Sequence, residues 1–372
     1  MNLSYWEHKS WFTNLDFVVV GSGIVGLAAA LELRRKHPKA KIAVLERGML
    51  PSGASTKNAG FACFGSVSEL LDDLSVHSEK EVVALVKKRV DGLETLKNLL
   101  GTHAIGYDPC GGYELFTLQD EALYTQSLEA IGRLNKLLDP IFDAPVFSRL
   151  ENSFGFDNIQ PQLIFNAFEG KIDTGAMMQA FIKKAYGSDI QIINGATVTA
   201  MSDSTGGVSL EINGEFSIRA GRVLVATNGL AGSLLKEDLK PARAQVLITE
   251  PIANLHFNGT FHLDRGYYYF RNIDGRILFG GGRNLDMEGE TTTLMETTEQ
   301  IQTALDLLLR HTILPGKDVK IEQRWSGIMG VGSKKAPIVK QVSEHVYCGI
   351  RLGGMGVAIG ADTGTSLAKL ID

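Results

Sequence analysis

The sequence is poor in cysteine and has no surplus of positive charge. Its three cysteines, Cys63, Cys110 and Cys348, lie far apart and form no C-x-x-C pair, which argues against a disulfide scaffold and a zinc ribbon. So few cysteines fit a reducing compartment, and we expect a cytoplasmic protein. The net charge of −5 argues against general nucleic-acid binding, which needs a basic surface.

Long apolar runs and common hydrolase motifs are also missing. The longest low-charge run, between Asp16 and Glu32, holds 15 residues, short of the roughly 20 that cross a bilayer. The polar, aromatic start of the chain has no apolar core, so we expect no secretion signal. G-x-S-x-G, G-K-[ST] and H-E-x-x-H are absent, and the eight histidines lack metal-ligand spacing. We predict no membrane span and no metal, and histidines with surface or packing roles.

Glycine, in contrast, is abundant. The chain has 41 glycines in 372 residues, about 11%, against a typical value of ~7%. With only 10 prolines, this excess is neither collagen-like nor typical of disorder. Glycine serves tight turns and close approach of the backbone to a ligand. At roughly 150 residues per domain, the length predicts two or three domains.

Strand-forming and helix-forming segments alternate along the chain. The first three, strand 17–20, helix 24–36 and strand 41–46, predict a βαβ unit with parallel strands. Asn213-Gly214 and Asp274-Gly275 are typical of hairpin turns. Further helices are predicted at 66–100, 120–138, 174–186 and 294–310, and strands at 113–118, 190–193, 208–212, 216–219, 222–227 and 345–350, with a β-rich stretch at 244–283.

A dinucleotide-binding fingerprint occupies the turn of the βαβ unit. Gly21, Gly23 and Gly26 fit G-x-G-x-x-G, and the second strand ends in Glu46, 20 residues after Gly26. In this motif the glycines allow a tight turn and close packing of the helix on the strand. The helix N-terminus faces the pyrophosphate, and the acidic residue accepts hydrogen bonds from the ribose hydroxyls. A glycine-rich turn without a cofactor is the alternative. The unit alone does not distinguish FAD from NAD.

Four further segments resemble one family of FAD enzymes, that of D-amino-acid oxidase, glycine oxidase and sarcosine oxidase. They are S-G-A-S-T-K-N-A-G at 52–60, V-L-V-A-T-N-G at 223–229, R-W-S-G-I at 324–328 and G-G-M-G-V at 353–357. The S-Y-W-E segment at 4–7 is similar to the start of the amine-oxidising, γ-glutamylputrescine oxidase-like branch. The first of these segments, directly after Glu46, favours FAD over NAD.

The resemblance implies an α/β fold of two domains, neither of which is continuous in sequence. A Rossmann-like FAD-binding domain is expected from residues 12–65, 166–235 and 335–372. An α+β substrate domain on a mostly antiparallel sheet is expected from residues 66–165 and 236–334.

FAD is then expected to lie extended across the fingerprint and the segments that follow the strands. Since residues 326–337 hold no cysteine, the position where some sarcosine-oxidase relatives tether flavin is empty, and we expect non-covalent FAD. The candidate cofactor-binding residues are Gly21, Ser22, Gly23, Ile24, Val25, Gly26, Glu46, Arg47, Ser55, Lys57, Asn58, Ala59, Gly60, Val198, Ala226, Thr227, Asn228, Gly229, Gly353, Gly354, Met355, Gly356 and Val357.

Candidate substrate-positioning residues lie in the strand at 267–271. The period of two places Tyr267, Tyr269 and Arg271 on one face, where they could line a cavity or form a plain aromatic sheet face. Some relatives carry a carboxylate-binding arginine where this chain has Met329, which puts an ordinary α-amino acid substrate in doubt. A carboxylate would then need Arg271, Arg324 or Arg351.

The function implied is FAD-dependent oxidation of the C–N bond of an amine or amino acid, by hydride transfer to flavin N5 and hydrolysis of the imine. The electron acceptor, O2 or another molecule, stays open, as does the oligomeric state. The alternatives are oxidation of a C–O bond, as in related glycerol-3-phosphate dehydrogenases, and a non-catalytic flavoprotein subunit.

Overall fold

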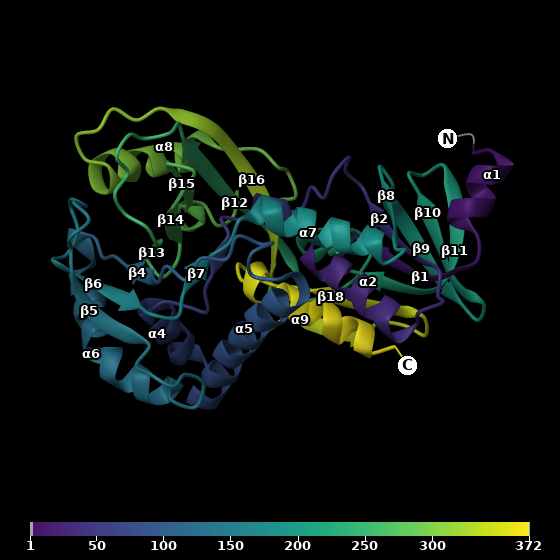
Figure 1. Cartoon of the computed structure of the whole chain (residues 1–372), viewed down its shortest axis with the longest axis horizontal. Coiled ribbons are helices and arrows are strands. Elements are labelled where there is room, and N and C mark those ends of the chain that lie inside the picture. Colours follow the sequence, from purple (N-terminus) through teal and green to yellow (C-terminus); the bar gives the residue numbers. More distant parts are fainter. Residues whose placement is uncertain (1–2, 372) are drawn as a thin grey trace.

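Two large β-sheets organise the chain, as a computed structural model that describes residues 3–371 shows (Figure 1). Residues 1, 2 and 372 lie outside the described part, including the last residue of the expected FAD-binding segments. In Figure 1 the first sheet lies beside α2 and α9 on the right, and the second lies under α8 on the left. The helices are α1 (Tyr5–Glu7), α2 (Ile24–Lys36), α3 (Ala54–Lys57), α4 (Val67–Val76), α5 (Glu79–Leu100), α6 (Glu121–Leu138), α7 (Thr174–Gly187), α8 (Glu299–Leu308) and α9 (Gly356–Lys369).

The first sheet has a parallel centre in the order β18-β11-β1-β2-β8. The strand β17 pairs antiparallel with β18 at one end, and β10 and β9 extend β11 as an antiparallel layer. This arrangement confirms the predicted βαβ unit. The strands are β1 (Leu15–Val20), β2 (Ile42–Glu46), β8 (Gln191–Asn194), β9 (Val198–Ser204), β10 (Gly207–Ile212), β11 (Phe216–Val225), β17 (Ile338–Gln341) and β18 (Val346–Ile350).

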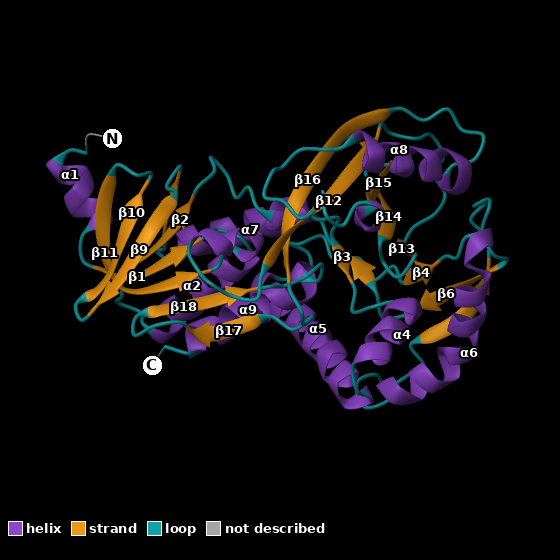
Figure 2. Ribbon diagram, turned by 180° about the vertical axis from the view of Figure 1, so that it is seen from behind, coloured by secondary structure: helices purple, strands orange, loops and turns teal. Residues whose placement is uncertain are grey.

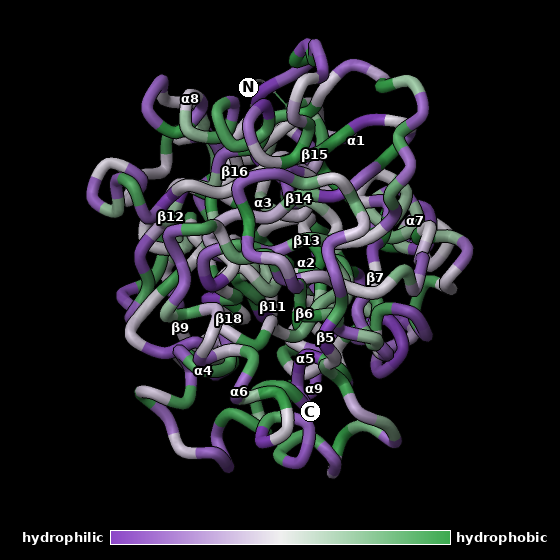
Figure 3. Tube along the Cα trace, turned by 90° about the vertical axis from the view of Figure 1, so that its left-hand side faces the viewer, coloured by the Kyte–Doolittle hydropathy of each residue, from purple (hydrophilic) through white to green (hydrophobic). Residues whose placement is uncertain are grey.

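Both faces of this parallel centre are buried. Helices α2, α7 and α9 cover one face, as Figure 2 shows from behind, and alternate side chains of β1 such as Val18 and Val20 pack with β9 and β10 on the other. The continuous apolar run of β1 is typical of a strand buried on both faces. Hydrophobic segments gather in the interior of the molecule and hydrophilic ones in the outer loops (Figure 3).

The second sheet is mostly antiparallel, in the order β16-β12-β15-β14-β13-β4-β6-β5. One of its faces packs under α8 on an aromatic core in which the rings of Phe261 and Phe270 stack at 4.6 Å. Its strands are β4 (Gly112–Glu114), β5 (Phe147–Glu151), β6 (Gln162–Asn166), β12 (Lys240–Thr249), β13 (Thr260–Leu263), β14 (Tyr268–Ile273), β15 (Arg276–Gly281) and β16 (Ile321–Val331), and a separate pair is formed by β3 (Phe61–Ala62) and β7 (Gly170–Lys171).

Several predicted elements have different bounds in the structure. The helical stretch 66–100 is two helices, because Ser78 caps a new helix through the backbone N–H of Glu81. The expected strands 216–219 and 222–227 are the single strand β11. The helix expected over 294–310 begins only at Glu299. Both hairpin turns are confirmed, with Asn213 and Asp274 in the left-handed region at φ 57° and 49°.

Glycines allow the helices over the first sheet to pack closely. A Cβ on Gly364 of α9 would lie 2.3 Å from the carbonyl oxygen of Val25 in α2, and one on Gly92 of α5 would lie 2.1 Å from that of Ala358. Helix α9 is therefore held by both α2 and α5. Among the described residues, none of the helices is long and apolar enough to cross a membrane.

We expect Gly364→Ala to lower the free energy of unfolding by ~1–3 kcal/mol, because the added methyl group meets backbone that cannot rotate away. Gly132→Ala is the matched control, since a Cβ at Gly132 in α6 meets nothing within 4 Å. There the better helix propensity of alanine should stabilise the protein by ~0.5–1 kcal/mol. Urea unfolding of the two variants measures both; equal effects would contradict the close contact.

Candidate active site

The carboxyl ends of the central strands of the first sheet meet at one edge. The turn from β1 to α2 lies there, with Gly21 at φ +103°. A Cβ on Gly26 would lie 1.9 Å from the carbonyl oxygen of Gly21, so this position admits only glycine. Helix α2 begins after Gly23, which supplies no side-chain cap. Ile24 and Val25 form its first, buried turn. A crevice at this edge is where open α/β sheets bind ligands.

Glu46, at the end of β2, holds the fingerprint turn. Its buried carboxylate accepts the Ser22 hydroxyl at 2.7 Å and the Ser22 backbone N–H at 3.2 Å. It also accepts the backbone N–H of Gly48 at 2.9 Å. The acidic side chain therefore orders both loops around the place where the fingerprint expects ribose. Arg47, next in sequence, is exposed.

The segment 54–60 follows as α3 and a loop. Ser55 Oγ accepts the backbone N–H of Ile24 at 3.0 Å, which links this segment to the start of α2. Asn58 Oδ1 accepts the Gly60 N–H and the Thr174 hydroxyl, both at 2.9 Å. Ser55 and Asn58 therefore shape the loop through hydrogen bonds within the protein.

The second sheet reaches across to this loop. The indole N–H of Trp325 on β16 donates to the carbonyl oxygen of Lys57 at 3.0 Å. Arg271 on β14 donates from Nη1 to the carbonyl oxygens of Gly60 at 3.1 Å and Ile172 at 2.7 Å. The loop thus lies between the two sheets and is fixed from both.

Two more predicted segments reach the same edge. The ends of β11 and β18 are joined by Asn228 Oδ1, which accepts the backbone N–H of Leu352 at 3.2 Å. Gly353, at φ +59°, precedes Gly354 and the start of α9 at Gly356, and the N-cap residue Met355 makes no side-chain cap. Val357 is buried in the first turn of α9. Ala226 and Gly229 are also buried here.

The residues at this edge fit FAD. The hydroxyl of Thr227 is buried with no hydrogen-bond partner in the described part of the chain. Helices α2 and α9 both begin at this edge without a side-chain cap from their own N-cap residues, so their positive dipole ends lie here together with backbone N–H groups of their first turns. These groups suit the pyrophosphate and the electron-rich edge of the flavin. Val198, at the start of β9, is buried in the core behind β2.

A row of paired residues crosses the inner face of the second sheet. The strand registers pair Trp325 with Val246, Val246 with Gly280, Gly280 with Tyr269, Tyr269 with His262, and His262 with Glu114. Directly paired residues share one face of a sheet. Ala59 and Phe61, next to the loop, pack on this row, and the Phe61 ring contacts the rings of His262 at 5.2 Å and Tyr269 at 5.7 Å.

The glycines at 280–282 have a packing role. A Cβ on Gly280 would lie 2.7 Å from the ring of Tyr269, so glycine leaves the space that this ring occupies. Gly281 makes a similarly close approach to the backbone of Tyr267. Glycine at position 280 therefore lets the ring of Tyr269 lie against β15.

The predicted substrate-positioning residues separate in space. Tyr269 and Arg271 lie on the inner face, whereas Tyr267 precedes β14 and packs against the aromatic core of the opposite face. Arg324 is exposed and donates to Gln302 on α8. Arg351 is buried in an ion pair with Asp238 at 2.6 Å. The structure thus brings two of the five candidates to the loop at residues 57–60.

Burial shifts the pKa values of Tyr269 and Arg271, the two candidates on the inner face. Burial raises the pKa of Tyr269 to about 12, so its phenol stays protonated and can donate a hydrogen bond. Burial lowers the pKa of Arg271 to about 10, which leaves it a cation at neutral pH. The Nε atom of Arg271 is buried without a partner among the residues described.

A buried ionic cluster continues the inner row, and the sequence did not reveal it. His262 Nε2 lies 2.9 Å from Glu169, which also accepts the hydroxyl of Thr260 at 3.1 Å. Glu114 accepts the hydroxyls of Ser66 and Ser68 at the start of α4. The available signal was polar residues alternating with Phe261 and Leu263, yet the histidines were expected only in surface or packing roles.

The cluster shifts two pKa values upward. Burial lowers the pKa of His262, but the charge of Glu169, with those of Glu69 and Glu114, outweighs burial and raises it to about 9. Burial raises the pKa of Glu114 to about 7, against the hydrogen bonds of Ser68 and Ser66. The His262 imidazolium is therefore held one strand away from Tyr269, and the Glu114 carboxyl group two strands away.

These features define a two-domain, dinucleotide-binding oxidoreductase. A family model described as FAD dependent oxidoreductase (DAO) matches residues 16–370, and the chain belongs to this family. The predicted family, fold class and cofactor FAD are confirmed. The boundaries of the two domains remain a prediction.

Curated relatives and solved structures resemble the chain at low identity. It is 24% identical over 334 residues to bifunctional protein ThiO/ThiG of Synechocystis, covering 85% of this chain and only 45% of the relative. It is 23% identical to the probable oxidoreductase OrdL of Haemophilus influenzae, covering 96% and 82%. The structure of glycine oxidase from Geobacillus kaustophilus superposes with a TM-score of 0.76 at 19% identity, covering 95% and 94%.

The buried ionic cluster should make the free energy of unfolding decrease as pH rises. The folded state binds the His262 proton more tightly than the unfolded state, so this contribution is complete below the ordinary pKa of 6.5 and is lost as pH rises through about 9. The raised pKa of Glu114 adds a loss between 4.5 and about 7. We expect His262→Gln to reduce the pH dependence of the free energy of unfolding, measured with urea, between pH 6.5 and about 9.

His8→Gln, at an exposed histidine, is the control and should keep the wild-type slope. An unchanged slope in His262→Gln would show that the ion pair with Glu169 does not hold this proton.

Proposed function

We propose that the chain is an FAD-dependent enzyme that oxidises the carbon–nitrogen bond of an amine or amino acid. The observation that carries the proposal is the inner face of the second sheet, on which Tyr269 and Arg271 lie beside the loop at residues 57–60. Glycine oxidase, by its name, acts on an amino acid, and its fold matches this chain over nearly its whole length. FAD, when bound, supplies a two-electron acceptor that takes a hydride at flavin N5.

The chain's residues would position the substrate and exclude water. A C–H bond next to nitrogen loses hydride, the nitrogen loses a proton, and the resulting imine reacts with water to give a carbonyl compound and an amine or ammonia. Tyr269, a neutral phenol, donates a hydrogen bond to a substrate oxygen and leaves the nitrogen lone pair free to assist the loss of hydride. Trp325, Val246 and Phe61 supply apolar walls that strengthen such contacts.

The arginine placement bears on the substrate's charge. Arg324 and Arg351 have acceptors within the protein, and Met329 occupies the position where some relatives have an arginine. Only Arg271 lies at the loop, with one of its terminal nitrogens already donating to two carbonyl oxygens. We therefore expect at most one direct guanidinium contact to a substrate carboxylate.

Anaerobic bleaching of the flavin tests the activity. The FAD-loaded enzyme is mixed with a panel of primary amines, N-methyl amino acids and D-amino acids, and with glycerol 3-phosphate as a C–O substrate. Bleaching by a nitrogen compound is the expected result, and readmitted O2 distinguishes an oxidase from a dehydrogenase by the rate of reoxidation. Bleaching by glycerol 3-phosphate alone, or by none of the compounds, would contradict the proposal.

The rate constant of flavin reduction should rise with pH across pH 6–10, because hydride leaves only from a neutral amine. Tyr269 does not titrate in this range, since burial raises its pKa to about 12. His262 does titrate, so the profile is measured in wild type and in His262→Gln. A rate constant independent of pH in both would count against the amine mechanism.

Tyr269→Phe should lower kcat/KM about 5- to 10-fold through loss of one hydrogen bond, with FAD content and stability unchanged. The matched control is Tyr268→Phe, since Tyr268 packs in the aromatic core on the opposite face. We expect the control to stay within about twofold of wild type. Equal losses in the two variants would remove Tyr269 from the proposed site.

FAD should be released by acid precipitation, because the segment 326–337 has no cysteine and Cys63 and Cys348 are buried in the described structure. Yellow colour in the supernatant is the expected result. Colour that stays in the washed pellet would show a covalent link.

A further inference from the structure

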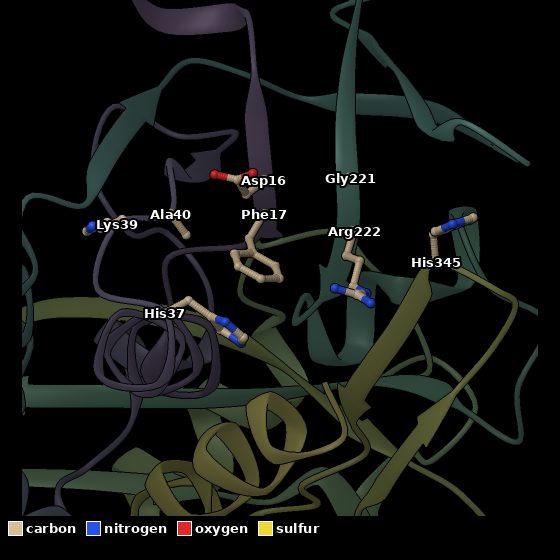
Figure 4. Close-up of a pocket in the computed structure, with 8 residues that line it drawn as sticks. All are labelled: Asp16, Phe17, His37, Lys39, Ala40, Gly221, Arg222 and His345. Atoms are coloured by element: carbon tan, nitrogen blue, oxygen red, sulfur yellow. The ribbon is translucent and has the colours of Figure 1, made fainter. Parts of the chain in front are cut away.

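A cavity lies near the amino ends of the central parallel strands of the first sheet, on the edge opposite the turn from β1 to α2. It measures about 450 Å³, within the range of small-molecule sites. It is formed near the starts of β1, β2 and β18, beside the part of β11 that pairs with β1 and where α2 ends, and Figure 4 shows its lining. The lining residues are Asp16, Phe17, His37, Lys39, Ala40, Gly221, Arg222 and His345.

Arg222 is the main unsatisfied group in this cavity. It lies on β11, paired with Phe17 on β1, and its side chain is partly buried. Its five N–H donors have neither a hydrogen-bond acceptor nor a carboxylate partner in the described residues. The side-chain nitrogens of Arg222 stay open to water, so an oxyanion that enters the cavity can bind them without displacing a partner within the protein.

His37 adds a second polar group. It follows the last turn of α2, and its ring packs on Phe17 with the centroids 5.0 Å apart. Its Nε2 atom is buried and lacks a hydrogen-bond partner among residues 3–371. In Figure 4 the rings of Phe17 and His37 and the guanidinium of Arg222 gather at the centre, with Lys39 and His345 to either side.

The charges of the lining favour an anion. Lys39 and Arg222 carry two positive charges against one negative charge on Asp16, and the Asp16 carboxylate already accepts the backbone N–H of Lys41 at 2.7 Å. His345 is bound through Nδ1 to Asp203 at 2.7 Å and contributes less. A guanidinium fork matches the paired oxygens of a carboxylate or phosphate.

We propose that this cavity binds a small oxyanion, a carboxylate or a phosphate group, with Arg222 as its principal ligand and His37 as the second. The site is separate from the turn at Gly21, because residues 17–20 of β1 and 222–225 of β11 lie between Arg222 and that turn. It therefore does not depend on the nature of the oxidised substrate.

Calorimetry of the FAD-loaded enzyme tests the site, with the pyrophosphate crevice already filled. Sodium phosphate and sodium acetate are titrated separately at constant ionic strength, which distinguishes the two sources of oxyanion. Saturable binding of at least one, with Kd in the millimolar range or below, is expected. Absence of saturable heat for both up to about 100 mM would overturn the proposal.

Arg222→Gln should weaken that binding about tenfold or more, since a charge-assisted pair of hydrogen bonds is lost. Arg219→Gln is the matched control, because Arg219 lies on the same strand, is exposed and does not line the cavity. Unchanged binding in Arg222→Gln would overturn the assignment. Should that variant fold poorly, His37→Gln, which keeps a polar side chain, is expected to weaken binding several-fold.

Two further measurements, histidine NMR and flavin absorbance, show where the anion binds. The NMR signals of His37 in histidine-labelled protein should shift along the same binding curve as the heat. The flavin absorbance should stay constant during the titration. A flavin spectrum that changes with the anion would locate binding in the active-site cavity and contradict the proposal.

Discussion

Two hydrogen bonds to backbone carbonyl oxygens of one loop hold the proposed active site together. Trp325 donates to Lys57 and Arg271 donates to Gly60, and both donors belong to the second sheet. The loop itself follows β2 of the first sheet and touches the start of α2 through Ser55. The position of this loop, a candidate cofactor-binding segment, is thus set by the sheet that carries the candidate substrate residues. Since both donors are large and partly or fully buried, a shift of either sheet would misplace the loop.

The inner face of the second sheet combines fixed charge with apolar walls. Towards β16 the row is apolar, with Trp325 and Val246, and towards β4 it is ionic, with His262 and Glu114. Tyr269 stands between the two halves and makes ring contact with Phe61. A substrate that meets this row would encounter a hydrogen-bond donor at the border of the two environments. The arrangement is suited to a molecule with one polar and one apolar end.

The sequence predicted the turns and helix starts at the edge of the first sheet better than the inner face of the second sheet, for a physical reason. The fingerprint glycines and Glu46 act through local turns and helix ends, whose geometry depends on only a few neighbouring residues. The pairing of His262 with Glu114 joins segments 148 positions apart, and no local pattern contains that register. The arginines show the same limit, because Arg271, Arg324 and Arg351 look alike in sequence, yet their acceptors lie on other segments. Alternation in 267–271 correctly predicted that Tyr269 and Arg271 share one face. Tyr267 does not share it, because β14 begins only at Tyr268.

The close contact of α9 with α2 has a consequence for biosynthesis. The strand β18 and helix α9 complete the sheet and helix layer that β1 and α2 began, more than 300 residues earlier along the chain. On the ribosome, the early βαβ unit must wait until α9 has been synthesised before Gly364 can pack against Val25. During that interval the apolar side of α2 stays uncovered by its final neighbour. The edge at which α2 and α9 begin is therefore complete only after both distant segments of the chain are made.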